Sequence, residues 1–560
     1  MVMRTGFSAA LCALVIAALL ATGYLIGPRG WDDGAITVSF ARTFALTGEF
    51  ALTTISERVE GFSSLLYMAL LSLLIPTDAG QMETQILISQ WLTVASLTGA
   101  GTVLFLALGR TIPSAAARLF IVAVFLAFPQ HFRETMNGME MTLFGFLLIA
   151  WVAAAERGYP VLELVLIPLI LLTRFEAVFY LGVVYGALFL IRNGERGRFF
   201  WRGVLVLAVF GLITLGRWVH VGDIMPNTIW AKMQPPYSPD ISLLAELAYK
   251  SGGPADFLNV MGPLLLTGLL FMLARPGGWV FRSPAFWLVV AFVLFSALTG
   301  RDYAYEGRLF LGVLPVIVFL VAEIVSRSVP DGSGGHGPFP VVATALVVAA
   351  LVNLSELKAS AVLVLKRMDE TGQLPDRVAA AVQGPISRRE FPATPLQFAG
   401  NGWIVDEVRR AIGEDRMVLM APDVGGLGLC CEAGTLEVID NALLTSRTLA
   451  REGYGALPGL LEARRPEMIL THFVWASESG IYDLELFNEA YRPMVVRDTL
   501  FWVRADVRDR LLAAGGRVEG VAGLHRLERL RNDLRAADLE FLTRRTPYPV
   551  EIVVLPVEQS

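Results

Sequence analysis

Apolar residues gather in twelve runs over the first 353 residues, separated by polar loops. The runs are residues 7–26, 62–76, 85–109, 116–130, 141–155, 161–173, 177–191, 203–216, 255–274, 283–299, 309–325 and 339–353. A membrane helix needs about 20 apolar residues, so the pattern predicts a mainly α, polytopic transmembrane bundle of about 11–12 helices. The run at 62–76 is short and ends at Pro76, and we expect it not to cross fully.

Arginines in the short loops predict the orientation of these helices, because cytoplasmic loops carry the excess of Lys and Arg. The loop Arg192–Arg202 holds four arginines, and we place it in the cytoplasm with the loops at Arg157, at Arg275–Arg282 and after Arg327. Counting crossings puts the other loops on the opposite, extracytoplasmic side, which is the periplasm for a bacterial inner membrane. These are 31–61, 138–140, 173–176, 217–250 and 301–308, together with everything after residue 353.

From about residue 354 the pattern changes to short β-rich runs that alternate with helical stretches. This alternation is typical of an α/β domain. We therefore predict a transmembrane module over residues 1–353 and an extracytoplasmic, soluble α/β domain over residues 354–560. The expected strands are 417–420, 436–439, 468–471, 494–496 and 500–503, and the expected helices include 445–464 and 504–545.

Composition agrees with a membrane protein. Of the 560 residues, 54% are hydrophobic and 17% are charged, against about 25% charged in a soluble domain. The mean hydropathy is +0.57. A formal net charge of −5 argues against nucleic acid as a partner. The adjacent Cys430 and Cys431 are interpreted as two small buried apolar residues rather than as a disulfide.

Asp32 and Asp33 stand side by side directly after the first apolar run. Two neighbouring carboxylates repel each other and lose hydration near lipid, so their presence at the mouth of a membrane helix favours a functional role. The alternative is structural, because aspartates also cap the free N–H groups at a helix N-terminus.

Further acids and cations gather in the loops of the predicted periplasmic side: Glu60, Glu140, Glu176, Asp223, Arg133, Arg174, Lys232, Arg301 and Arg308. A carboxylate can act as general base on an acceptor hydroxyl, while guanidinium and ammonium groups stabilise a departing phosphate. Structural alternatives remain. Arg174 and Glu176 could pair with each other, Glu140 could cap the next helix, 222–227 could be an ordinary turn, and Arg301 and Arg308 could be interfacial anchors.

An ordered series of motifs resembles the terminal arabinofuranosyltransferases of mycobacteria, integral membrane glycosyltransferases with the GT-C fold. The matching segments are Trp31–Ile36, Phe40–Arg42, Val59–Leu65, Gly138–Met141, Thr173–Ala177, Gly222–Thr228 with Lys232, Gly307–Phe310, Asp423–Gly428 and Val438–Asp440. Phe175 and Ala177 depart from the family pattern of Pro and Gly, and residues 441–443 depart from Leu-Ala-Gly.

The resemblance implies an inverting transfer of a sugar, arabinofuranose or another pentose or hexose, from a polyprenyl-phosphate donor to an envelope glycan or lipid acceptor. It implies Asp32 as the catalytic base, with Asp33 as neighbour or alternate. Glu60 and Glu140 would complete an acidic site for a divalent cation (Mg, Mn or Ca) or for the acceptor. Arg174, Lys232 and Arg308 would hold the donor phosphate, with Glu176, Asp223, Asn227 and Arg301 nearby.

The main alternative is a transporter or flippase of lipid-linked sugars. Transporters commonly carry inverted repeats and broken helices with polar groups at the membrane midplane. No repeat is evident here, and the acids lie in loops.

Overall fold

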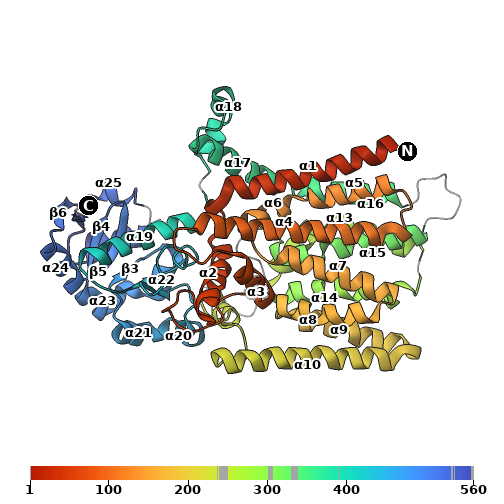
Figure 1. Ribbon diagram of the computed structural model, residues 1–560, viewed down its shortest axis with the longest axis horizontal. Helices are drawn as coiled ribbons and strands as arrows, with labels where there is room; N and C mark the ends of the chain where they lie inside the picture. The colour runs from red at the N-terminus through yellow and green to blue at the C-terminus, as the bar shows by residue number, and fades with distance from the viewer. Residues whose placement is uncertain are drawn as a thin grey trace.

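The computed structural model describes residues 2–235, 237–238, 250–275, 277–299, 307–328, 338–389, 391–530, 534 and 536–556. Every one of the twelve apolar runs falls in a helical segment, as predicted. These helices lie roughly along one direction and form a bundle. The bundle lies beside the part of the chain from residue 354 onward, here called the C-terminal part (Figure 1). They are α1 (Val2–Ile26), α3 (Leu65–Leu74), α4 (Met82–Ala107), α5 (Ala115–Leu126), α6 (Pro129–Asn137), α7 (Met141–Arg157), α8 (Pro160–Thr173), α9 (Ala177–Ile191), α10 (Arg196–Val221), α13 (Gly252–Ala274), α14 (Pro284–Thr299), α15 (Leu314–Ser328) and α16 (Phe339–Val352).

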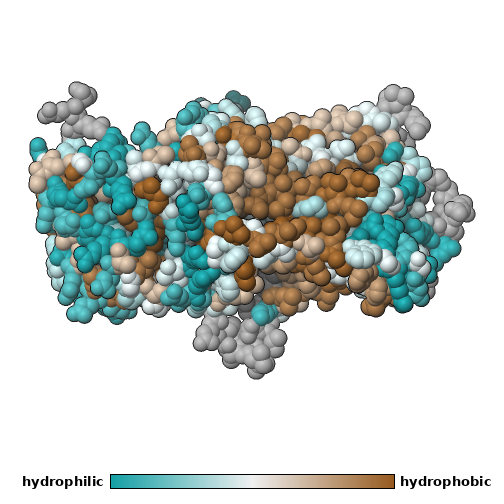
Figure 2. All heavy atoms as spheres, turned by 60° about the horizontal axis from the view of Figure 1, so that its bottom comes forward, coloured by the Kyte–Doolittle hydropathy of each residue, from teal (hydrophilic) through white to brown (hydrophobic). Residues whose placement is uncertain are grey.

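Among the described residues, five helical segments are long and apolar enough to cross a membrane, and two bent helix pairs raise this number to seven. Shorter apolar helices pack among them, including α3, α8 and α9. The α3 helix has only 10 residues, and a break at residues 127–128 separates α5 from α6, so that these two helices meet at 53°. Apolar side chains cover the outside of the bundle in a belt, with hydrophilic surface at both ends (Figure 2). Such a belt suits a lipid environment.

Two further helices lie outside the twelve apolar runs. The α2 helix (Asp32–Thr47) follows α1 through a 3₁₀ turn at Gly27–Arg29, and α11 (Asn227–Lys232) follows α10. In Figure 1 α2 lies between the bundle and the C-terminal part. It begins at the aspartate pair, whose negative charge suits the N-terminal end of a helix dipole.

The C-terminal part contains a seven-stranded mixed sheet with the order β2-β1-β3-β5-β4-β7-β6. The strands are β1 (Met417–Ala421), β2 (Leu436–Asp440), β3 (Met468–Ile469), β4 (Tyr491–Val496), β5 (Thr499–Arg504), β6 (Arg517–Val521) and β7 (Glu551–Val554). Its helices are α17 (Leu354–Glu370), α18 (Asp376–Ser387), α19 (Pro395–Ala411), α20 (Arg447–Glu452), α21 (Leu457–Arg464), α22 (Phe473–Ser479), α23 (Glu485–Ala490), α24 (Ala505–Ala513), α25 (Leu524–Leu527) and α26 (Ala536–Glu540). The predicted α/β character is confirmed, while the boundary at residue 353 stays a prediction.

The predicted helix over residues 504–545 is wrong in part. Among the described residues of this range, only short helical segments form, namely α24, α25, α26 and a π-helical turn at Phe541–Arg545, and β6 interrupts them by pairing with β7 in an antiparallel ladder. The β6 residues are mostly exposed, because this strand forms an edge of the sheet. A charged, exposed edge strand lacks the apolar alternation that identifies a strand in a sequence.

The expected burial of Cys430 and Cys431 is confirmed, while the expectation that they do not form a disulfide is wrong. The structure joins them in a disulfide between adjacent residues. Both side chains are buried. The sequence alone shows burial but not whether two sulfurs are oriented toward each other, so the pairing required the structure.

Candidate active site

The α2 helix is fixed between two neighbouring segments that approach it very closely. A Cβ atom at Gly34 would overlap the carbonyl oxygen of Asn137, and a Cβ atom at Gly425 would overlap the carbonyl oxygen of Asp32. Glycine is the one residue that permits such backbone approach at both points. Because of these two contacts, the aspartate pair lies at the junction of the bundle and the C-terminal part.

Asp32 is buried, with 4% of the residue exposed, and its carboxylate binds the C-terminal part. One oxygen accepts the N–H of Gly425 at 2.8 Å and the other accepts the N–H of Gly426 at 2.9 Å. Burial raises the pKa of Asp32 well above its usual value, and the charge of Asp423 raises it further, while the two amide bonds lower it. Both oxygens of Asp32 are therefore engaged by protein amides.

Two polar side chains further along the same helix continue this interface. Ser39 donates to the carbonyl of Gly425, and Arg42 donates to the carbonyls of Gly428 and Cys431. Together with Asp32 they hold the segment 425–431 through five hydrogen bonds across almost 400 residues of sequence. The polar face of α2 is largely a docking surface for this segment.

Asp33 differs from its neighbour in exposure and in partner. Its side chain is 47% exposed, and one carboxylate oxygen pairs with the Arg308 guanidinium at 3.0 Å. Arg308 begins the 3₁₀ segment Arg308–Val313 that leads into α15, and its side chain is only 10% exposed. The same guanidinium lies 3.8 Å from the sulfur of Met139, next to Glu140. The pair thus brings a predicted base and a predicted phosphate ligand together.

Glu140 lies beside this pair but has other partners. It is fully buried, and its carboxylate pairs with Arg174 at 2.5 Å. Arg174 also pairs with Glu176 at 2.7 Å, as the structural alternative for these two residues expected. Glu140 makes no capping hydrogen bond to α7, since Glu134 accepts the N–H of Met141 instead. Two carboxylates therefore surround one guanidinium, and the triad carries a net negative charge.

Glu60 forms a separate buried ion pair with Arg217 at 2.7 Å. Both side chains are at most 3% exposed. Burial raises the pKa of Glu60, while the Arg217 charge lowers it. The backbone of Glu60 also accepts the N–H of Asn227, so the first loop and the segment after α10 are joined at this point.

The segment 222–227 holds the C-terminal part rather than forming an isolated turn. Asn227 donates through its amide to the carbonyls of Leu443, Leu444 and Ser446. Asp223 pairs with Arg451 of α20 and accepts from Trp230. Lys232 is exposed at the end of α11. Arg301 lies outside the described residues.

Groups of the C-terminal part, together with Tyr237 after α11, complete the candidate site. Asp423, in a left-handed conformation (φ 53°), pairs with His472 at 2.9 Å. Burial raises the pKa of Asp440 to about 7, although the N–H groups of Thr445 and Ala442 lower it. Burial raises the pKa of the Tyr237 hydroxyl well above its usual value, and three carboxylates raise it further by their charge: Asp440, Asp33 and Asp423.

Sequence reasoning missed Arg217, Tyr237 and His472 as members of this region. Arg217 lies 157 residues from its partner, and such a separation carries no spacing signal. The acids predicted to form one site instead have individual partners. Among the described residues, no group of three or more His, Cys, Asp or Glu side chains is arranged to hold a metal ion. A divalent cation stays a prediction, and no step proposed below depends on one.

Two crystal structures of ArnT from Cupriavidus metallidurans are similar to this chain. The apo structure covers 90% of this chain and 99% of its own, with 15% sequence identity and a TM-score of 0.51. The structure bound to undecaprenyl phosphate covers 82% of this chain and 92% of its own, with 15% identity and a TM-score of 0.44. No family model and no curated protein matches the sequence. The predicted GT-C fold is therefore confirmed, as a helical membrane bundle with a C-terminal α/β part.

Proposed function

We propose that this protein is a membrane glycosyltransferase that moves a sugar from a polyprenyl-phosphate donor to a glycan or lipid acceptor of the cell envelope. The observation that carries the proposal is the pair of Asp33 and Arg308, 275 residues apart, at the junction of the bundle and the C-terminal part. It combines a half-exposed carboxylate with a guanidinium, which are the two groups that this reaction requires. The GT-C fold supports the assignment.

Accessibility favours Asp33 over Asp32 as the general base. Asp32 has the raised pKa, but both of its oxygens accept amide N–H groups and the residue is 4% exposed. An acceptor hydroxyl must come within hydrogen-bond reach of the base that takes its proton. Asp33 meets this condition, because its side chain is 47% exposed. The hydrogen bonds of Asp32 to the amides of Gly425 and Gly426 hold the start of α2, and with it Asp33, in place.

The ion pair of Asp33 and Arg308 describes the protein before donor binding. A donor phosphate competes for Arg308, and the carboxylate that Arg308 releases becomes a stronger base. Asp33 then takes the proton of the acceptor hydroxyl as its oxygen bonds to the anomeric carbon. The bond from that carbon to the phosphate oxygen breaks, and polyprenyl phosphate leaves with its added charge stabilised by Arg308.

The remaining cations have different expected roles. Arg174 is surrounded by Glu140 and Glu176, and this negative surrounding disfavours a phosphate. We assign Arg174 to holding Glu140 in place beside the reacting groups, and the exposed Lys232 to the donor phosphate. The resemblance to arabinofuranosyltransferases makes arabinofuranose the first sugar to test, with inversion at the anomeric carbon and the site on the periplasmic side.

The test is transfer by the purified full chain in lipid nanodiscs, with a panel of polyprenyl-phosphate pentoses and hexoses. Asp33→Asn keeps the shape of the side chain but cannot take the proton, and we expect turnover to fall by about 10²–10⁴-fold. Glu49→Gln is the matched control, because Glu49 forms an exposed ion pair with Arg58 in the same loop.

Two results would overturn the proposal. Wild-type turnover in Asp33→Asn would remove Asp33 as the base. Absence of transfer from every donor, combined with movement of a labelled donor across vesicles that contain the protein, would replace the enzyme with a transporter.

A further inference from the structure

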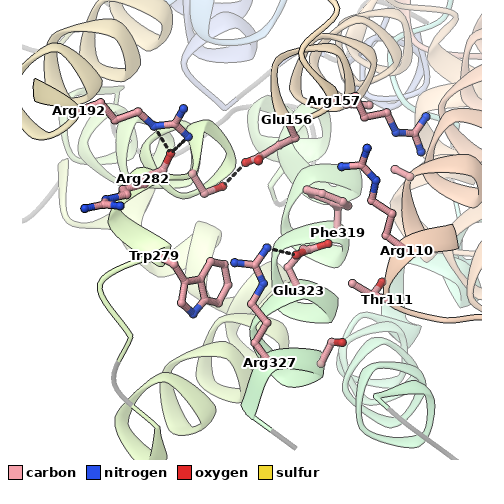
Figure 3. A pocket seen from close by; sticks show the side chains of 14 residues that line it. Arg110, Thr111, Glu156, Arg157, Arg192, Trp279, Arg282, Phe319, Glu323 and Arg327 are labelled. Carbon is pink, nitrogen blue, oxygen red and sulfur yellow. Dashed lines mark hydrogen bonds and ion pairs between the residues drawn. The ribbon is translucent and has the colours of Figure 1, made fainter. Parts of the chain in front are cut away.

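A cavity of about 350 Å³ lies at the end of the bundle opposite to the candidate active site. The helices α7, α9 and α15 begin directly after Glu140, Glu176 and the Arg308 segment, and their far ends line this cavity. At 1.5 Å per residue the 17 residues of α7 separate the two ends by about 25 Å. The cavity is therefore independent of the site described above (Figure 3).

Basic side chains dominate the lining of the cavity. It contains five arginines but only two glutamates, Glu156 and Glu323. The arginines come from five separate points of the chain: Arg110, Arg157, Arg192, Arg282 and Arg327. In Figure 3 the side chains of Arg110 and Arg157 extend toward each other along one side of the cavity, although both are positively charged. Mutual repulsion of this kind favours an anion between them.

Helix capping accounts for some of these arginines but not for all. Arg157 donates to the carbonyl of Leu106 at the end of α4, and Arg192 donates to the carbonyl of Arg282. Arg327 pairs with Glu323 and lies over the Trp279 ring. In the part of the chain that the structure describes, the guanidinium groups of Arg110 and Arg282 have no partner.

The net charge of the cavity lining also favours an anionic ligand. The arginines exceed the glutamates by three. The helix C-termini at this end, such as those of α4, α7 and α9, are accompanied by the N-termini of α5, α8, α10 and α14, so the helix dipoles largely offset one another. The excess of positive side chains remains and suits an anionic phosphate group.

Apolar surface adjoins the cationic opening and identifies the source of that anion. Leu106, Leu190 and Phe281 are 52%, 69% and 44% exposed, and each lies within two residues of a residue that lines the cavity. A free phosphate gains nothing from contact with apolar side chains, whereas the acyl chains of a lipid would bury them. Basic pockets between membrane helices are known to receive lipid head groups.

We propose that this cavity binds the phosphate-bearing head group of an anionic membrane lipid, with Arg110 and Arg282 as its ligands and the lipid chains against Leu106 and Phe281. Glu156, which accepts from Ser283, and Glu323, which holds Arg327, keep the remaining positive charge localised on one side. The site would anchor this end of the bundle to the anionic leaflet.

The test is native mass spectrometry of the full chain in detergent, titrated with phosphatidylglycerol or with phosphatidylcholine. We expect tighter binding of phosphatidylglycerol to the wild type. Arg110→Ala with Arg282→Ala should weaken it by about tenfold for each arginine, since each would make a charge-assisted hydrogen bond. The conservative pair Arg110→Lys with Arg282→Lys keeps the charge and should retain most of the binding.

Arg196→Ala is the matched control. Arg196 is exposed four residues after Arg192 and does not line the cavity, so its loss removes one positive charge from the same end, and it is compared with Arg110→Ala alone. An equal loss of lipid in this control would mean that the surface charge as a whole attracts lipid and would overturn the proposal. Equal binding of the two lipids, or full displacement of phosphatidylglycerol by inorganic phosphate, would overturn it as well.

Discussion

The two ends of the helical bundle differ in how their arginines are paired with carboxylates. At the candidate active site three buried arginines have carboxylate partners: Arg308 with Asp33, Arg174 with Glu140 and Glu176, and Arg217 with Glu60. At the far end five arginines share two glutamates. The first end is closed by ion pairs in which the carboxylates outnumber the arginines, and the far end is positive and open.

This difference follows from burial. A buried charge without a partner costs several kcal/mol, so a buried cation within the site needs a carboxylate or, as Arg42 has, backbone carbonyls as its partner when the protein folds. At the far end the arginines are mostly half-buried or exposed, and water or lipid can solvate them. A ligand at the closed end must therefore displace an existing partner, whereas a ligand at the open end only adds one.

The largest effect on stability should come from breaking a closed pair. Arg217→Ala leaves the carboxylate of Glu60 buried without its cation, and we expect a loss of about 3–5 kcal/mol. The measurement is the thermal unfolding midpoint of the purified protein in detergent. The double variant Arg217→Ala with Glu60→Gln should recover part of the loss, because it removes the stranded charge.

Arg58→Ala supplies the control for this prediction. Its partner is Glu49, and the two side chains are 66% and 31% exposed, so the loss should be at most about 1 kcal/mol. Equal shifts for Arg217→Ala and Arg58→Ala would show that the buried pair is no more important than a surface pair.

The second prediction concerns how the stability of the candidate-site end depends on pH. It follows a carboxylate of that end, because arginines keep their charge at every accessible pH. The pKa of Asp440 is about 7 in the folded protein, against 3.8 for an ordinary aspartate. Between these values the folded state holds a proton that the unfolded state has lost, so stability should fall as pH rises from about 4 to 7. The difference is up to about 4 kcal/mol.

Asp440→Asn removes this titration and should flatten the dependence of the unfolding midpoint between these two pH values. Its side-chain oxygen can still accept one of the N–H groups of Ala442 and Thr445, so some folding is retained. A slope that is identical in the wild type and in Asp440→Asn would contradict the raised pKa.

The third prediction separates the two ends by activity. Arg308→Ala removes the group that stabilises the leaving phosphate, and transfer should fall by about 10²–10³-fold. Arg308→Lys keeps a cation but not the planar guanidinium, and its loss of transfer activity should be intermediate. Arg377→Ala, at an exposed position of α18, is the control and should turn over as the wild type does. Unchanged transfer in Arg308→Ala would remove the phosphate role.

Local pattern was enough to predict most of the fold. The twelve apolar runs became helices because burial of apolar side chains in a bundle or in lipid is decided within each segment. Strands β1 to β5 were also visible as β-rich apolar runs. The exposed edge strand β6 was not, because its side chains gain little from burial and its pairing with β7 is decided by a distant partner.

The same distinction between local pattern and distant partners applies to the candidate site. The Asp32–Asp33 pair and Arg308 stood out because charged residues next to apolar runs are costly anywhere. Which acid meets which cation was not predictable, since Glu60 and Arg217 or Asp33 and Arg308 are joined only by the packing of the whole bundle. The docking role of Asp32 depended on two glycine amides almost 400 residues away.

The smallest effect, and the most informative, should distinguish the two adjacent aspartates. Asp32→Asn can accept one of the two N–H groups of Gly425 and Gly426, so one buried amide loses its partner, at a cost of about 1–3 kcal/mol. We expect faster hydrogen exchange at the amides of segment 425–431, measured by mass spectrometry on the intact protein. Asp33→Asn should leave that exchange unchanged, because Asp33 contacts Arg308 and not this segment, while it abolishes transfer. If instead Asp32→Asn abolished transfer with normal exchange at 425–431, the base would be Asp32, and the buried carboxylate would have to become accessible when the acceptor binds.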